Sequence, residues 1–124
     1  MKIAVVTDDH QTISAHFGRA AYYEIFTIEN GKVAGRQTMP RANHQHVGLD
    51  DPHHEGHQHN HDHNAMIEPI LDCQALITRG MGNGAYNALK IRSIEPLITD
   101  IKEIEAAVSA YLAGTLIDHP ERLH

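Results

Sequence analysis

Three short apolar runs constrain the fold of this chain more than any other feature of its sequence. They are residues 2–7, 75–78 and 97–99, and each is too apolar for a strand with one wet face. Such runs are typical of strands that are covered on both faces, as in a parallel sheet. Apolar residues at helical spacing follow the second and third runs. Strands that alternate with helices in this way predict an α/β fold with helices packed against the sheet.

A β-hairpin is predicted between the first and second runs. Residues 22–28 are rich in β formers, and the Asn30-Gly31 pair that follows them is a strong hairpin signal. Residues 33–39 form the returning strand, which Gly35 interrupts. Because the alternation of this strand is poor, we expect it at an edge of the sheet.

Three helices are expected. The first covers residues 64–72, with Asn64 as its cap; its inward side chains are Met66, Ile67, Ile70 and Leu71. The second covers residues 85–91. The third follows a capping box at Asp100–Glu103 and stops at Gly114. Its apolar face consists of Ile101, Ile104, Val108, Tyr111 and Leu112.

The chain length of 124 residues fits a single domain, which we place at residues 1–114 with a C-terminal tail at 115–124. Residues 44–63 interrupt it. Eight of these 20 residues are His, four are acidic, and none is Lys or Arg. Such a segment cannot bury enough apolar surface to offset the entropy lost on ordering. We therefore predict a mobile, His-rich surface loop within the domain.

Charge and hydropathy exclude several classes of protein. The net charge is −6 and no basic run is present, which argues against nucleic acid as a partner. No apolar segment approaches the roughly 18 residues that a membrane span needs, so we expect no membrane association. The N-terminus lacks the apolar region of a signal peptide, and we expect a cytoplasmic protein. With one cysteine, the chain cannot form an internal disulfide or a cysteine-rich zinc site.

The His-rich segment is a candidate metal site, because neutral imidazole is the commonest side-chain metal ligand near neutral pH. Ligand type favours Zn(II), Ni(II), Cu(II) or Fe. The candidate ligands are His44, His46, His53, His54, His57, His59, His61 and His63. The alternative is a solvated loop that holds no metal, since composition alone supports the binding prediction.

A glycine-rich turn, Gly80–Gly84, follows the second apolar run and opens a helix. Bare glycines let backbone N–H groups approach a ligand, and a helix N-terminus favours anions. The alternative is a tight turn that needs glycine for backbone reasons. Ligands of parallel α/β sheets bind outside the carboxyl ends of the strands. At that edge His16, Arg19 and Arg79 can meet near the turn.

Cys73 precedes the second apolar run, and its thiolate would be a soft ligand for iron–sulfur species. A lone cysteine at this position is more often a small core residue. No arrangement suited to nucleophilic catalysis stands out, and adjacent Asp8 and Asp9 point to opposite faces of a strand. We therefore expect no enzymatic activity. The enzyme alternative, a small hydrolase that holds phosphate at the glycine turn, lacks a base and a nucleophile.

The segments KIAVVT, HFGRA and GMGNGA, in this order and with Cys73 between the last two, resemble the dinitrogenase iron–molybdenum cofactor biosynthesis family. This family includes NifX-type carriers and the C-terminal domain of NifB. The resemblance implies a ribonuclease H-like, three-layer fold with a five-stranded mixed sheet flanked by helices. The residues that match its motifs, together with neighbouring Arg79, are the candidate cofactor-binding set: His16, Phe17, Gly18, Arg19, Cys73, Arg79, Gly80, Met81, Gly82 and Gly84.

The resemblance also implies a function related to nitrogen fixation. The chain would transiently bind iron–sulfur or iron–molybdenum cofactor precursors and pass them to metallocluster assembly proteins. The alternative hypothesis is a metal buffer or chaperone that holds Zn, Ni or Fe ions on the His-rich loop. Deletion of residues 44–63 distinguishes the two hypotheses. A cluster carrier would still bind its cluster after the deletion, whereas a metal buffer would lose its metal affinity.

Overall fold

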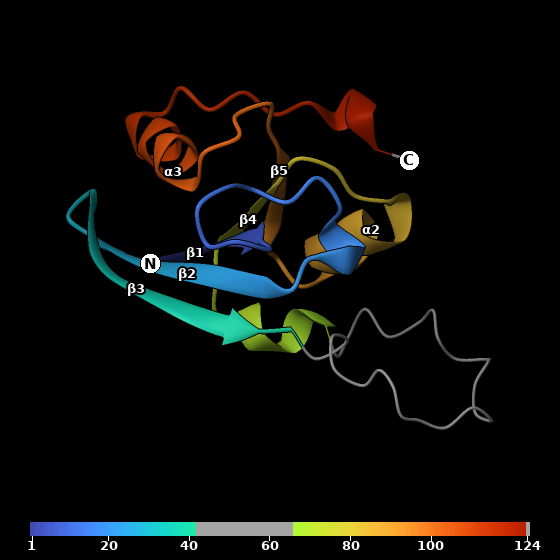
Figure 1. Cartoon of the computed structure of the whole chain (residues 1–124), viewed down its shortest axis with the longest axis horizontal. Helices are drawn as coiled ribbons and strands as arrows, with labels where there is room; N and C mark the ends of the chain where they lie inside the picture. Colours follow the sequence, from blue (N-terminus) through green and yellow to red (C-terminus); the bar gives the residue numbers. More distant parts are fainter. Residues whose placement is uncertain (42–65, 124) are drawn as a thin grey trace.

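The computed structural model describes residues 1–41 and 66–123, and its centre is a five-stranded sheet (Figure 1). The strands are β1 (Lys2–Thr7), β2 (Tyr22–Glu29), β3 (Lys32–Pro40), β4 (Ala75–Thr78) and β5 (Glu95–Ile98). The described α-helices are α2 (Asn83–Ile91) and α3 (Ile104–Ala113). Short 3-10 turns lie at η1 (Phe17–Arg19), η5 (Glu68–Ile70) and η6 (Pro120–Arg122). The predicted α/β fold is confirmed.

The sheet is mixed, with strand order β3-β2-β1-β4-β5. β1 pairs antiparallel with β2 and parallel with β4, while β4 and β5 are parallel. Among the described strands, β3 pairs with β2 alone and forms one edge, as its poor alternation predicts. The carboxyl ends of β1, β4 and β5 therefore share one edge of the sheet.

The hairpin between β2 and β3 turns at Asn30 and Gly31, whose φ angles are 55° and 75°. Two successive left-handed residues are the requirement of the two-residue type I′ turn, which explains the Asn-Gly pair. The hairpin prediction is confirmed.

The core lies on both faces of the sheet, which explains why the strands do not alternate. Ala4 and Val6 belong to the cluster packed against α2, whereas Ile3 and Val5 belong to the cluster packed against α3. All four side chains are fully buried. In Figure 1, α2 and α3 accordingly lie on opposite sides of the sheet.

The start of α3 differs from the prediction. The helix begins at Ile104, its N-cap is Glu103, and no side chain caps it, so the capping box at residues 100–103 is wrong. Tertiary contacts replace the cap: the Ile104 amide donates to the Gln11 carbonyl, and Glu103 bridges Thr12. The predicted end is confirmed, since Gly114 is the C-cap with a left-handed φ of 76°.

The helix expected at residues 64–72 is shorter within the described part of the chain. Residues 66 and 67 are helical, and η5 follows, because Pro69 removes a backbone donor from the turn. Ile67 and Ile70 are buried as expected, but Leu71 is 50% exposed. Two further bounds shift by two residues: α2 begins at residue 83 instead of 85, and β5 begins at residue 95 instead of 97.

The segment after Gly114 contacts the carboxyl end of β5. The Ile98 amide donates to Asp118 Oδ1 at 2.9 Å, and the His119 amide donates to the Ile98 carbonyl at 2.8 Å. The His119 ring contacts Glu121 at 2.8 Å and Asp100 at 3.2 Å. The two amide hydrogen bonds pair the backbone groups of Ile98, the last residue of β5.

The predicted His-rich loop at 44–63 lies outside the described residues. Across residues 1–41 and 66–123, no helix is long and apolar enough to cross a membrane.

Candidate functional site

Two loops that leave the carboxyl ends of β1 and β4 are joined by backbone hydrogen bonds. The Arg79 amide donates to the Ser14 carbonyl at 3.1 Å, and the Phe17 amide donates to the Gly80 carbonyl at 3.0 Å. Thr78 Oγ1 closes the turn by donating to the Gly80 carbonyl at 3.0 Å. The HFGRA segment and the glycine turn, far apart in sequence, therefore lie side by side next to α2 (Figure 1).

The HFGRA loop divides between the core and solvent. Phe17 is 1% exposed and packs in the cluster on the α2 side, whereas His16, Gly18 and Arg19 are exposed. The amides of Arg19 and Ala20 donate to the His16 carbonyl at 3.0 and 3.1 Å and form η1. Buried Phe17 thus anchors a tight turn that keeps His16 and Arg19 at the surface.

The glycine turn does not owe its composition to a left-handed backbone, because none of its three glycines has a positive φ. Gly82 is the N-cap of α2 with φ −87° and ψ 168°, and no side chain caps this end. Gly80 is buried, Gly82 half-buried and Gly84 exposed. Bare backbone therefore surrounds the first N–H groups of α2, which carry the positive end of the helix dipole.

The two loops are basic in an acidic chain. Residues 79–85 contain Arg79 and no Asp or Glu, whereas Lys90 and Arg92 lie at the other end of α2. Residues 10–22 contain Arg19, two His and no acid. Asp8 also lies at this end of the sheet, where its Oδ1 accepts a hydrogen bond from the Ala21 amide at 2.8 Å. Arg19 and Arg79 are the cations that an anionic ligand would meet here.

A buried cation that the sequence did not suggest supports the first loop. Arg41 is 1% exposed, follows β3 directly, and its Nη1 donates to the Phe17 carbonyl. The guanidinium lies 4.7 Å from the Phe17 ring centroid and 4.8 Å from that of Tyr23. A single Arg after a polar edge strand matches no motif, so only the tertiary structure identifies it.

Cys73 lies at the opposite end of β4 from the glycine turn. The next residue, Gln74, donates its amide to the Lys2 carbonyl, which places Cys73 near the start of β1. The length of β4, roughly 13 Å at 3.3 Å per residue, separates it from Gly80. Its side chain is 4% exposed, and burial, with the Asp72 carboxylate nearby, raises the pKa of the thiol to about 11. Cys73 shares the buried cluster on the α2 side with Phe17 and Met81, but it lies at the other end of β4 from the exposed residues of the two loops.

The eight candidate histidines of residues 44–63 lie outside the described residues. Within residues 1–41 and 66–123, no group of three or more His, Cys, Asp or Glu side chains could hold a metal ion. A metal held at the two loops would therefore draw at most two ligands of these types from the described side chains, and exposed His16 is one candidate.

A second polar cluster, which the sequence did not predict, lies on the α3 side of the sheet. Glu24 is 1% exposed and accepts hydrogen bonds from Arg36 Nε at 3.0 Å and Thr38 Oγ1 at 2.8 Å, and His10 Nδ1 lies 2.7 Å away. Burial raises the pKa of Glu24, but these hydrogen bonds outweigh burial and hold the pKa below its ordinary value. The cluster joins β2, β3 and the loop after β1.

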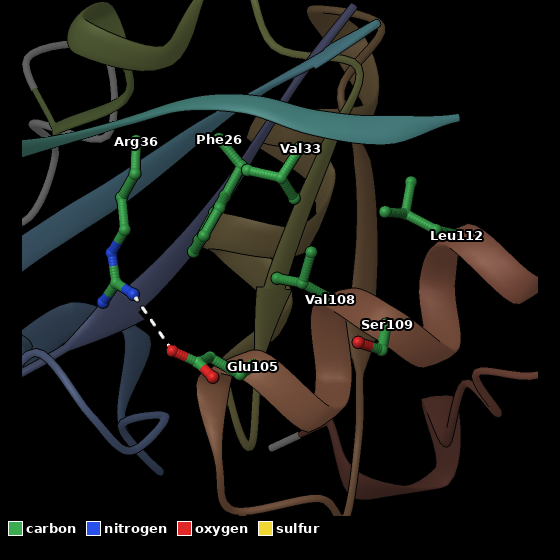
Figure 2. A pocket seen from close by; sticks show the side chains of 7 residues that line it. All are labelled: Phe26, Val33, Arg36, Glu105, Val108, Ser109 and Leu112. Carbon is green, nitrogen blue, oxygen red and sulfur yellow. Dashed lines mark ion pairs between the residues drawn. The ribbon is translucent and has the colours of Figure 1, made fainter. Parts of the chain in front are cut away.

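An apolar pocket of about 340 Å³ lies beside this cluster, between the hairpin and α3 (Figure 2). Phe26, Val108 and Leu112 line its wall, and an Arg36–Glu105 ion pair of 3.9 Å lies at its rim. None of the ten candidate cofactor-binding residues lines it.

Comparison with known proteins agrees with the motifs. Residues 1–114 match the family model described as dinitrogenase iron-molybdenum cofactor. The uncharacterized protein MJ0580 of Methanocaldococcus jannaschii is 25% identical over 116 residues, covering 94% of this chain and 89% of the relative.

Two solved structures share the fold. The crystal structure of PH0822 superposes with a TM-score of 0.72 at 20% identity, over 98% of this chain and 96% of that one. The apo form of the orange protein from Desulfovibrio gigas superposes with a TM-score of 0.71 at 17% identity, over 96% and 92%. With the family model spanning nearly the whole chain, this protein belongs to the dinitrogenase iron–molybdenum cofactor family.

Proposed function

We propose that the chain binds an anionic metallocluster precursor at the edge formed by the HFGRA loop and the glycine turn, and passes it to metallocluster assembly proteins. One observation carries this proposal: the hydrogen bond from the Phe17 amide to the Gly80 carbonyl joins the two family motifs into one surface. The cargo class, iron–sulfur or iron–molybdenum precursor, follows from the family.

The residues of this edge suit an anionic cargo. Exposed Arg19 and half-buried Arg79 can donate charge-assisted hydrogen bonds to it. The uncapped N-terminus of α2 adds backbone N–H donors. His16 offers one imidazole, a single metal bond that a carrier can release. In this proposal Cys73 is a core residue and the protein is a carrier without enzymatic activity.

We also assign the sheet to the ribonuclease H-like class, which its mixed order β3-β2-β1-β4-β5 supports. This assignment brings no nuclease function. Nuclease chemistry needs clustered carboxylates that hold metal, and a fold does not supply them by itself.

The test is anaerobic reconstitution with ferrous iron and sulfide, followed by metal analysis and visible absorption. The full chain and a variant that lacks residues 44–63 are compared. Iron with sulfide in both proteins supports binding by the α/β core. If iron and sulfide are at background level in both proteins, the proposal is overturned. If metal binds to the full chain alone, residues 44–63 and not the α/β core bind the metal, and the proposal is also overturned.

Two substitutions locate the cargo. Arg19→Ala and His16→Ala should each reduce bound iron, because both side chains are exposed beside the glycine turn. Lys32→Ala is the matched control. Lys32 is exposed in the β2–β3 hairpin, which lies past the start of β1, whereas Gly80 lies near the end of β1. Equal iron in all three variants would place the cargo elsewhere.

A further inference from the structure

Arg41 is held in the core by contacts to three separate parts of the chain. Its Nη1 donates to the Phe17 carbonyl, and its Nη2 lies 3.0 Å from Met66 Sδ. Its guanidinium stacks near the rings of Phe17 and Tyr23. The Tyr23 hydroxyl in turn donates to the Met66 carbonyl at 2.7 Å. The side chain thus joins η1, β2 and the segment that leads into η5.

Burial of this cation is costly, which indicates a specific use. Arg41 is 1% exposed, and its Nε has no hydrogen-bond partner. Among the described residues it forms no ion pair, although Asp8 is near enough to favour its charged form. A buried charge without an ion pair is retained only where other contacts compensate for lost hydration. Here Phe17 supplies two of the compensating contacts, through its carbonyl and its ring.

Phe17 is the residue through which the two loops meet. Its carbonyl accepts from Arg41, and its amide donates to the Gly80 carbonyl. Its ring packs in the core, 6.4 Å from the Tyr23 ring. A change at Arg41 therefore reaches the glycine turn through a single intervening residue.

On this basis, and resting on the proposed function, we propose that Arg41 is a positioning residue for the cargo site. Its guanidinium fork fixes the Phe17 peptide, which holds His16 and Arg19 in register with the glycine turn. Arg41 itself does not contact the cargo.

The substitutions Arg41→Lys and Arg41→Met separate geometry from charge. Lysine keeps the charge but loses the planar fork and its stacking, whereas methionine loses both. Arg36→Lys is a matched control on the α3 side. Arg36 Nη2 donates to the His10 carbonyl at 2.7 Å, and its guanidinium lies 5.0 Å from the Phe26 ring centroid.

Binding is measured anaerobically on the full chain with tetrathiomolybdate, a dianionic molybdenum–sulfur probe, by visible absorption. Loss of an outer contact of this kind typically weakens binding by about tenfold or more. We expect that effect for both Arg41 variants and a Kd near that of the wild type for Arg36→Lys. Wild-type affinity in Arg41→Lys, with weakening only in Arg41→Met, would assign the effect to charge and overturn positioning. Equal weakening in all three variants would assign it to general destabilisation and overturn the proposal as well.

If the wild type binds no probe, the proposed function is overturned but the positioning role of Arg41 is not yet decided. Amide hydrogen exchange tests that role independently of binding. The amides of Arg19 and Ala20 donate within η1. Both should exchange faster in Arg41→Lys than in the wild type, while the amides of β4 keep their protection. Unchanged exchange at these two amides would overturn the proposal.

Discussion

At the scale of single residues, burial separates the roles of the charged and reactive side chains. Arg41 and Glu24 are both 1% exposed, yet Glu24 is matched by basic partners and Arg41 is held mainly by carbonyl, sulfur and ring contacts. Sequence reasoning could not distinguish them from surface residues, because burial of a charge depends on neighbours that are distant in the chain.

Labelling and substitution of Cys73 test whether this cysteine is a metal ligand. Because its thiol is buried and has a pKa raised to about 11, we expect slow maleimide labelling of the native protein at about pH 8 and fast labelling in denaturant. We also expect Cys73→Ala to retain wild-type iron and sulfide in reconstitution. A large loss of bound cluster in this variant, with the fold intact by circular dichroism, would make Cys73 a ligand.

Asp9 gives a pH-dependent contribution to stability. Hydrogen bonds from the Thr12 and Gln11 amides lower the pKa of Asp9 from 3.8 to about 2. A carboxyl whose pKa is lowered by folding stabilises the fold fully above its unfolded pKa, and this contribution disappears as the pH falls through about 2. Asp9→Asn should therefore melt below the wild type at neutral pH, and the two melting temperatures should converge in acid. A constant difference in thermal unfolding down to about pH 2 would contradict this prediction.

At the scale of elements, two glycines that look alike in sequence have opposite roles. Gly114 ends α3 with a left-handed φ of 76°, whereas Gly18 lies in η1 without a positive φ. An added Cβ would meet no atom within 4 Å at either position. The cost of a side chain therefore comes from backbone strain at Gly114 and is absent at Gly18.

Gly114→Ala should reduce the free energy of unfolding by about 1 kcal/mol, the usual cost of a left-handed non-glycine residue. Gly18→Ala should leave stability unchanged or slightly higher, because alanine restricts the unfolded chain. Under the proposed function it should nonetheless weaken probe binding, since the new methyl group lies between the exposed His16 and Arg19. Urea denaturation and probe titration of the two variants check both statements. Wild-type binding by Gly18→Ala would remove this turn from the cargo surface.

At the scale of the whole molecule, the two outer strands of the sheet, β3 and β5, differ in their contacts. β3 is an open edge in the described structure, whereas Asp118 and His119 bond to the backbone of Ile98 at the carboxyl end of β5. An uncovered edge strand exposes backbone donors and acceptors that pair with other chains.

A variant that ends at Gly114 should therefore self-associate more than the full chain. Removal of the hydrogen bonds from the His119 amide and to Asp118 leaves the Ile98 backbone groups unpaired. Light scattering coupled to size exclusion should show a larger mass or aggregates that increase with concentration. Equal masses at matched concentrations would show that the C-terminal segment is not needed to protect this edge.

The sequence by itself determined the features that depend on local spacing and residue type. It predicted β1, β2, β4 and the edge strand, the Asn30-Gly31 turn and the Gly114 stop, because each follows from dihedral preference or from burial on two faces. It also carried the family motifs, which the match over residues 1–114 confirms.

Only the tertiary structure decided the contacts between distant segments. The Ile104 amide at the start of α3 donates to the Gln11 carbonyl instead of a local cap, and the Phe17 amide donates to the carbonyl of Gly80, about half of the chain away. Arg41 becomes a core residue, and Cys73 lies at the far end of β4. The physical reason is common to all four. The partner of a hydrogen bond and the neighbours of a buried side chain are groups that only the folded chain brings close together. Local periodicity in the sequence does not identify such distant partners.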